Sequence, residues 1–281
     1  MPELPEVEIT ARLIGAEVIG LRVTSAAAPG IGTLKSVTPS LETLVGKSIA
    51  GIRRRGKHLL IDFSNDSTLL LHLMSAGRLQ LFSKKASPRD RTARLNLDLE
   101  DGRQLRLREF GTRHSSWAKL LLSQNVDNED SLATLGPEAL PAPANLAELL
   151  KGARPLNAML RDQRVIAGIG RSWADEILHA AGLSPFKKGG DLTAAEVRSL
   201  RKAIDELLGG AIAHYEKTLS IPIPDKYPIP LRIHRHNGSP CPRCDGTIEA
   251  VFYDEHTMCY CPACQTHGKL LKDRRLSKLL R

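Results

Sequence analysis

The sequence has no long hydrophobic run: none of its 281 residues belongs to a stretch of about 18 apolar residues, the length that crosses a bilayer. Its opening residues, Met1-Pro2-Glu3, carry none of the positive charge with which a signal peptide begins. These two absences argue against an integral membrane protein and against an exported one. We therefore expect a cytoplasmic protein with no membrane partner.

Cysteine is absent from the first 240 residues, and this absence leaves little basis for a disulfide framework and indicates a reducing compartment. Cys241-Pro-Arg-Cys244 and Cys261-Pro-Ala-Cys264 are separated by sixteen residues, a spacing that lets two turns converge on one tetrahedral ion. Four thiolates leave no open position on the metal. We therefore predict one structural Zn²⁺ per chain, which stabilises a small β-hairpin and takes no part in catalysis.

Cys259 is the one cysteine outside these two pairs. Its spacing to Cys264 is less suited to a paired turn, so we expect a free thiol that packs as a small hydrophobic side chain. The alternative, in which Cys259 replaces Cys261 as a ligand, stays open.

A third glycine is missing from Gly168-Ile169-Gly170-Arg171, and no βα unit precedes it, so this segment is not a dinucleotide-binding fingerprint. A helical pattern follows the glycines, and the N–H groups at a helix N-terminus can bind a phosphate of DNA. Tight packing between helices is the alternative explanation. The chain also has no internal repeat.

Acidic residues are in deficit, since 31 Asp and Glu face 40 Lys and Arg. This balance favours an anionic partner, either nucleic acid or a membrane surface. Arg53-Arg54-Arg55-Gly56-Lys57 precedes an apolar strand, where it could approach a phosphate or form a solvated hairpin edge. The C-terminal cations could neutralise phosphates or line a solvated helix face. They are Lys269, Lys272, Arg274, Arg275, Lys278 and Arg281.

Hydrophobic periodicity divides the chain into a β-rich first part and a helical second part. After a helical stripe at 7–19, alternating runs predict antiparallel strands of a sandwich or barrel. These runs lie at 59–63, 69–73, 95–99 and 105–107. The polar, basic segment 83–94 predicts a surface loop. Helical patterns follow at 146–150, 158–161, 173–181 and 194–215. Four prolines within 217–230 predict an irregular loop.

The expected domain organisation follows from these shifts in pattern. We predict an N-terminal catalytic domain at 1–124, a linker at 125–144, a helical domain at 145–235, and a C-terminal part at 236–281 with the cysteines and the basic tail.

The first residues have the composition of a nucleophilic site. If Met1 is removed, Pro2 presents a free secondary amine, whose reference pKa of about 8 leaves a neutral fraction near pH 7. Such an amine can attack C1′ of a deoxyribose, and the neighbouring Glu3 can handle the protons. The alternative is that this segment only begins a helix, whose first turn carries Glu3, Glu6 and Glu8.

Several short segments occur in a recognisable order along the chain. They are Pro2-Glu3-Leu4-Pro5-Glu6-Val7-Glu8, Arg54-Arg55-Gly56-Lys57, His72-Leu73-Met74-Ser75-Ala76-Gly77, Arg108-Glu109-Phe110-Gly111, Leu135-Gly136-Pro137, Asp162-Gln163 to Gly170, and Cys264-Gln265. Together they resemble the formamidopyrimidine-DNA glycosylase and endonuclease VIII family of bacterial base-excision enzymes, over nearly the whole chain. The opening segment is typical of the formamidopyrimidine branch.

The resemblance implies an α+β multidomain fold with an N-terminal β-sandwich, a helix-two-turn-helix domain and a C-terminal zinc finger, with DNA in the cleft between domains. It implies a bifunctional glycosylase and AP lyase of base-excision repair, a monomer that acts on damaged DNA at the bacterial nucleoid. Pro2 would form a Schiff base and cleave the strand by β/δ-elimination. Glu3 would act as general acid or base, Glu6 would support the site, and Lys57 would contact the phosphate.

The resemblance also implies which residues touch DNA. Met74, Arg108 and Phe110 match the side chains that fill the hole left by an everted base, where a thioether and a ring replace stacking and a guanidinium bonds the orphaned base. Five residues depart from the family pattern at positions expected to touch DNA. In this chain, Arg171 stands where the family usually has Asn, His256 where it has Arg, Asn157 where it has Lys, Glu109 where it has Arg, and Arg106 where it has an acidic residue. Of these five, Arg171 and His256 are predicted DNA-binding residues. These departures leave open a non-catalytic protein that binds damaged DNA.

Overall fold

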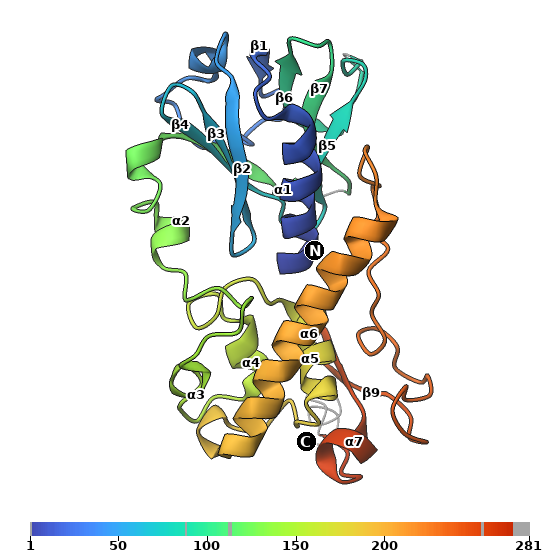
Figure 1. Cartoon of the computed structure of the whole chain (residues 1–281). Coiled ribbons are helices and arrows are strands. Elements are labelled where there is room, and N and C mark those ends of the chain that lie inside the picture. Colours follow the sequence, from blue (N-terminus) through green and yellow to red (C-terminus); the bar gives the residue numbers. More distant parts are fainter. Residues whose placement is uncertain (1, 88, 112–113, 254–255, 272–281) are drawn as a thin grey trace, which may run out of the picture. The chain divides into compact units, whose positions relative to one another are not determined.

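The computed structural model describes residues 2–87, 89–111, 114–253 and 256–271 (Figure 1). The chain forms two compact units. The first comprises Met1–Thr134 and Ile212–Pro228, and the second Leu135–Ala211 and Ile229–Arg281. The four-part division expected from the sequence remains a prediction.

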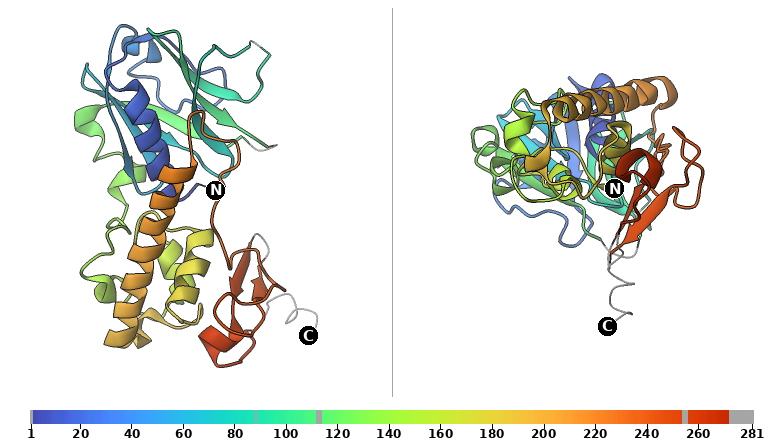
Figure 2. Two further views of the ribbon diagram at one scale, coloured as in Figure 1. Left: turned by 45° about the vertical axis from the view of Figure 1, so that its right-hand side comes forward. Right: turned by 90° about the horizontal axis from the view of Figure 1, so that it is seen from below.

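The first unit is built on two antiparallel sheets of four strands each, in the orders β1-β6-β7-β5 and β2-β3-β4-β8 (Figures 1 and 2). The strands are β1 (Val23–Ala27), β2 (Ile49–Arg55), β3 (His58–Phe63), β4 (Ser67–His72), β5 (Gly77–Phe82), β6 (Ala93–Leu99), β7 (Gln104–Glu109) and β8 (Trp117–Leu122). Leu59–Ile61 and Leu69–Leu71 are wholly buried, so the centre of the second sheet is covered on both faces. The turn between these strands has Asp66 at φ +56°, a conformation that Asp tolerates well.

Helix α1 (Leu4–Val18) packs against strands of both sheets, β2, β3 and β5. It begins three residues before the apolar stripe at 7–19, because Glu3 caps it and Pro5 fits its first turn. Its core-facing residues, among them Val7, Ile14 and Val18, are fully buried. Short helices complete this unit. They are η1 (Leu41–Leu44), η2 (Ser123–Asn125) and α2 (Asp130–Ala133).

The second unit consists of helices and a small hairpin. Its elements are α3 (Leu146–Leu149), α4 (Leu156–Arg161), α5 (Arg171–Ala180), η3 (Gly189–Asp191), the first part of α6 (Ala194–Thr218), β9 (Glu249–Phe252), β10 (Thr257–Tyr260) and α7 (Pro262–Thr266). Helix α5 packs against α4, β10 and α7. Helix α6 is capped by a reciprocal pair, since Thr193 N donates to Glu196 Oε2 at 2.9 Å and Glu196 N donates to Thr193 Oγ1 at 3.3 Å.

The predicted fold class is confirmed: a β-sandwich, a helical part and a cysteine-bearing hairpin follow one another along the chain. The predicted irregular loop is present, because α6 ends at Thr218 and no further helix or strand begins before Glu249. The loop predicted at 83–94 is wrong at its end, where β6 starts at Ala93 and Arg94 is buried. None of the helices in the described ranges combines the length and the hydropathy that a bilayer-spanning segment needs.

Candidate functional site

The N-terminal residues are held at the start of α1. Glu3 is the N-cap residue, and its backbone N–H donates to Glu6 Oε2 at 2.8 Å. Glu3 and Glu6 are 2% and 0% exposed, and Pro2 is also buried. A carboxylate that bonds back to the N-cap fixes the direction in which the chain enters its helix. The glutamates therefore do open a helix, and the same helix start holds Pro2 beside a carboxylate.

Glu6 is anchored in turn by a residue that the sequence patterns did not reveal as part of the site. Its Oε1 accepts a hydrogen bond of 2.7 Å from the hydroxyl of Tyr215, which is fully buried. Burial raises the pKa of Tyr215, and the charge of Glu6 raises it further, so the phenol stays protonated and remains a donor. Glu6 thus links Tyr215 to the Glu3 backbone, and its role in supporting the site stays a prediction.

A second buried contact reinforces this arrangement. Thr10 Oγ1 lies 2.5 Å from the hydroxyl of Tyr227, and burial raises the pKa of Tyr227 to about 12. The guanidinium of Arg78 lies 5.0 Å from the centre of the same ring. Segment 212–228 thereby supplies two phenols that pack against α1, although only its prolines were conspicuous in the sequence.

The basic run at 53–57 divides into residues with different roles. Arg54 Nε donates to Glu8 Oε2 at 2.9 Å, and its side chain is only 8% exposed, so it ties α1 to β2. Arg53 is half exposed and pairs with Asp62 at 2.8 Å along the sheet. Arg54 therefore forms neither a phosphate contact nor a solvated hairpin edge, the two explanations left open for this run, because its charge is paired inside the protein.

Lys57 lies in the turn between β2 and β3 and is 9% exposed. The neighbouring imidazoles of His58 and His72 are in edge contact, with ring centroids 4.7 Å apart. Burial lowers the pKa of His58 to about 4 and that of His72 to about 3, and the charge of Lys57 adds to both shifts. Both rings are therefore neutral at pH 7, and Lys57 and Arg55 supply positive charge beside them.

Met74 and Phe110 stand on the connections that follow β4 and β7, and neither is part of the buried core. Met74 has φ +49°, and its N–H donates to His72 Nδ1 at 3.0 Å. The guanidinium of Arg108 lies 4.6 Å from the ring centre of Phe110 and donates to Asp225 Oδ1 at 3.2 Å. The three residues predicted to fill the DNA stack are thus partly exposed.

The expectation that all five departures lie where DNA is touched is wrong for Glu109 and Arg106. Glu109 is 2% exposed, and its carboxylate accepts hydrogen bonds from the N–H groups of Ser115 and Ser116 at 2.8 and 2.9 Å. Arg106 is 6% exposed, and its guanidinium lies 4.4 Å from the Phe82 ring centre. Strand alternation places the two side chains on opposite faces of β7, and each is buried by its own protein contacts.

Asn157 is the third departure that is buried, at 6% exposure. Its Oδ1 accepts from Arg161 Nη1 at 3.1 Å, and its Nδ2 donates to Asp175 Oδ1 at 3.4 Å. Arg161 Nη1 also lies 2.9 Å from His256 Nε2. A guanidinium only donates, so His256 Nε2 is the acceptor in this contact. Arg161, which the sequence analysis did not single out, thus brings a positive charge to His256.

Arg171 is exposed at the first position of α5, directly after its N-cap residue Gly170. The glycine segment therefore does lead into a helix N-terminus, as predicted. Of the basic C-terminal residues only Lys269 is described, and it is exposed; those at 272–281 lie outside the described residues.

The four paired cysteines come together as predicted. Their sulfur atoms all lie within 4.8 Å of one another, with Cys241–Cys264, Cys244–Cys261 and Cys244–Cys264 separations of 3.8, 3.6 and 3.3 Å. Four thiolates about 2.3 Å from a tetrahedral ion are about 3.8 Å apart, so the cluster fits a metal of that size.

Cys259 lies outside this group. It is fully buried, and its Sγ accepts a hydrogen bond of 3.3 Å from the Arg235 N–H.

A histidine lies against one of the four clustered cysteines. His179 Nε2 lies 3.2 Å from Cys241 Sγ, and such contacts orient metal ligands.

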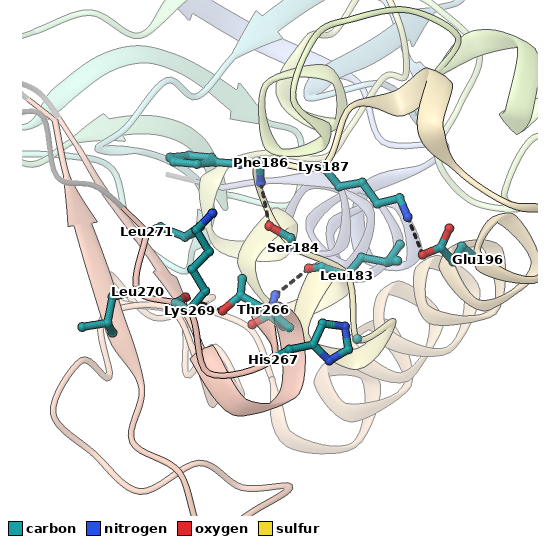
Figure 3. A pocket seen from close by; sticks show the side chains of 12 residues that line it. Leu183, Ser184, Phe186, Lys187, Glu196, Thr266, His267, Lys269, Leu270 and Leu271 are labelled. Atoms are coloured by element: carbon teal, nitrogen blue, oxygen red, sulfur yellow. Dashed lines mark hydrogen bonds and ion pairs between the residues drawn. The ribbon is translucent and has the colours of Figure 1, made fainter.

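A pocket of about 660 Å³ opens beside the hairpin of the second unit, between residues 182–187 and 265–271 (Figure 3). Lys187 and Glu196 form an ion pair of 2.6 Å on one side. Gln265, which also lines the pocket, donates to the Leu183 carbonyl at 2.8 Å. The pocket contains none of the predicted catalytic residues or metal ligands.

Two family models match this chain. The formamidopyrimidine-DNA glycosylase N-terminal domain matches residues 1–113, and the H2TH domain of the same enzymes matches residues 135–222. The formamidopyrimidine-DNA glycosylase of Chloroflexus aurantiacus is 35% identical over 282 residues, covering 94% of this chain and 98% of that protein. That of Geobacter sulfurreducens is 34% identical over 280 residues, covering 94% and 100%.

Solved structures of a bacterial relative have the same fold. The Lactococcus lactis enzyme in complex with DNA containing N7-benzyl-Fapy-dG superposes with a TM-score of 0.83 at 26% identity, covering 94% of this chain and 100% of that one. Its complex with abasic-site DNA gives 0.82 at 25% identity, covering 94% and 99%. With both its sequence relatives and its fold in agreement, the chain belongs to the formamidopyrimidine-DNA glycosylase family.

Proposed function

We propose that this protein is a DNA glycosylase and AP lyase that removes oxidised bases from DNA, working as a monomer at the bacterial nucleoid. One observation carries the proposal: Pro2 and Glu3 are held at the N-cap of α1 by the Glu6 bridge to Tyr215. The names of the relatives and the damaged DNA in the Lactococcus lactis complexes support the same activity.

The chemistry starts at the amine of Pro2 once Met1 is removed. The nitrogen lone pair attacks C1′, the bond from C1′ to the damaged base breaks, and the base leaves with a proton. Glu3 moves protons at the sugar, which assists ring opening to an iminium ion. The iminium withdraws electrons, so loss of the C2′ proton expels the 3′ phosphate, and loss of the C4′ proton expels the 5′ phosphate. Water then hydrolyses the remaining iminium, which breaks the bond to C1′ and frees the amine of Pro2.

The other site residues bind and position the DNA. Lys57 is a cation beside two neutral imidazoles and is suited to a phosphate next to the reacting sugar. Arg171 and His256 contact DNA phosphates. Arg161, which lies against His256, supplies the positive charge at that contact. Zn²⁺, held by the four cysteines, supplies a fixed fold for the hairpin and no chemistry.

Glu3→Gln should stop release of an intact damaged base, because an amide cannot transfer the proton, and general acid–base groups contribute about 10²–10⁴-fold. The measurement is base release from a duplex with a formamidopyrimidine or 8-oxoguanine. An abasic duplex bypasses this step and should still be opened. Glu17→Gln, near the exposed end of the same helix, should release the base at the native rate. Equal losses in both variants would count against the role of Glu3.

Phe110→Ala should reduce lesion cleavage at least tenfold while changing the melting temperature little, because this ring is partly exposed and would act only in the DNA stack. The control is Phe63→Ala, which truncates a ring 3% exposed within β3 and should cost roughly 3–5 kcal/mol of stability. A large melting shift with native cleavage in Phe110→Ala would place the ring in the core instead.

A further inference from the structure

A basic pocket on the first unit has no part in the chemistry proposed above. It has a volume of about 870 Å³, and the described residues that line it include Arg89, Arg91, Arg94 and His114. Asp90 is the one acidic residue among them. Three guanidinium groups thus face one carboxylate, a balance that attracts an anion.

Arg94 is the least exposed of these cations, at 7%. The pairing of β6 with β7 shifts register between Ala93 and Leu95, so Arg94 stands at an irregularity of the kind that redirects a side chain. Within the described residues, its side chain makes one hydrogen bond, from Nε to Thr33 Oγ1 at 3.5 Å, which is the limit of such a bond. A buried guanidinium without a carboxylate is costly, and an anion in the pocket would remove that cost.

Asp90 does not fill this role. Its Oδ1 accepts from Thr92 N and Oγ1 at 2.9 and 2.6 Å, and its Oδ2 accepts from Arg106 at 3.3 Å. Although burial acts to raise the pKa of Asp90, the Thr92 bonds and the nearby arginines lower it overall, so the carboxylate is ionised and already bonded. The charges of Arg89, Arg91 and Arg94 are therefore not balanced by this residue.

The space for the Arg94 side chain depends on a glycine. A Cβ on Gly30 would lie 2.5 Å from Arg94 Nε, closer than real contacts allow, and 3.0 Å from Arg94 Cα, which is tighter than most real contacts. The Gly30 N–H donates to the Arg94 carbonyl at 3.1 Å, which keeps the two backbones together. The guanidinium is thus held in a defined position at the pocket.

The pocket also adjoins a residue that we propose to contact DNA. Ala93 is the register partner of Arg108, and Arg108 Nε donates to Thr92 Oγ1 at 2.8 Å. The family resemblance implies that Arg108 bonds the orphaned base, so a neighbouring pocket would meet the backbone of the strand that carries that base. Guanidinium groups match the geometry of phosphate oxygens through paired hydrogen bonds.

We propose that the pocket at Arg94 binds a phosphate group, with Arg89 and Arg91 adding charge, and that in the DNA complex this phosphate belongs to the strand opposite the lesion. The strand assignment rests on the proposed function. The same chemistry would also accept free phosphate or a small phosphate ester.

The test compares Arg94→Met with Arg22→Met, which removes one cation from an exposed ion pair with Glu100 next to β1. Binding to a duplex with a tetrahydrofuran abasic analogue is titrated at several NaCl concentrations. Arg94→Met should lower the slope of log K against log salt by about 0.9, the value for one phosphate contact, while Arg22→Met leaves it unchanged. Separately, sodium phosphate at constant ionic strength is tested for its effect on the melting temperature of the native protein and both variants.

If the salt-dependence slope changes only in Arg94→Met, the pocket binds a DNA phosphate. If phosphate raises the melting temperature of the native protein and of Arg22→Met but not of Arg94→Met, the pocket binds a free phosphate compound. Either result supports the site. Native behaviour of Arg94→Met in both assays overturns it. Should Arg94→Met fail to fold, the double variant Arg89→Ala/Arg91→Ala, at two exposed positions, takes its place. Borohydride trapping of the native protein at low salt separates the two proposals, since its absence would refute the enzymatic function without touching the phosphate-induced melting result.

Discussion

Borohydride added to the mature protein and abasic-site DNA should trap a covalent complex through Pro2. Borohydride reduces an iminium ion to a stable amine but leaves an acetal untouched, so trapping distinguishes amine attack from release of the base by water. The buried helix start supports the amine, because Glu3, Glu6 and Tyr215 hold the backbone there in one direction. The measurement is a shifted protein–DNA band on a denaturing gel, with the attachment residue identified by mass spectrometry.

The N-terminus supplies the controls for this result. Retention of Met1 or an N-terminal tag should abolish trapping, because the nitrogen of Pro2 is then an amide with no nucleophilic lone pair. Pro2→Gly still offers a primary amine and should retain part of the adduct, and loss of Lys57 should reduce trapping less than loss of the free amine. If the mature chain binds abasic DNA and is never trapped, a non-catalytic protein that binds damaged DNA becomes the better account.

Purified protein should contain one Zn²⁺ per chain. The Cys244→Ser variant should lose the metal, and its affinity for DNA should fall at least tenfold with it. Structural zinc contributes about 10–16 kcal/mol of apparent binding energy in small finger peptides, so a short hairpin with two strands of four residues depends on it. Metal analysis by mass spectrometry and binding to abasic-analogue DNA are the two measurements.

Cys259→Ser is the matched control, because it makes the same substitution two residues before Cys261 but lies outside the cluster. It should keep one Zn²⁺ per chain and native DNA affinity. Active, freshly purified protein that contains no zinc would refute the prediction, as would a loss of zinc in Cys259→Ser equal to that in Cys244→Ser.

The sequence predicted those parts of the protein that depend on local spacing. The cysteine pairs could be identified because turns of two intervening residues are a local property, and the structure brings their four sulfur atoms together. The strands at 59–63 and 69–73 and the helices at 173–181 and 194–215 were recognisable because periods of 2 and 3.6 residues differ within a single segment. The order of the short family segments identified the family.

Only the tertiary structure decided which polar residues are buried and which long-range partners they have. Glu109, Arg106 and Asn157 were expected at the DNA surface and are inside, because residue type does not reveal the direction in which a side chain points. Tyr215 was seen only as the end of a helical pattern, although it anchors Glu6 from 209 positions away along the chain. Arg94 was assigned to a surface loop, and a break in strand register buries it beside Gly30 and Thr33. Such contacts form when distant segments pack, and no local period in the sequence encodes them.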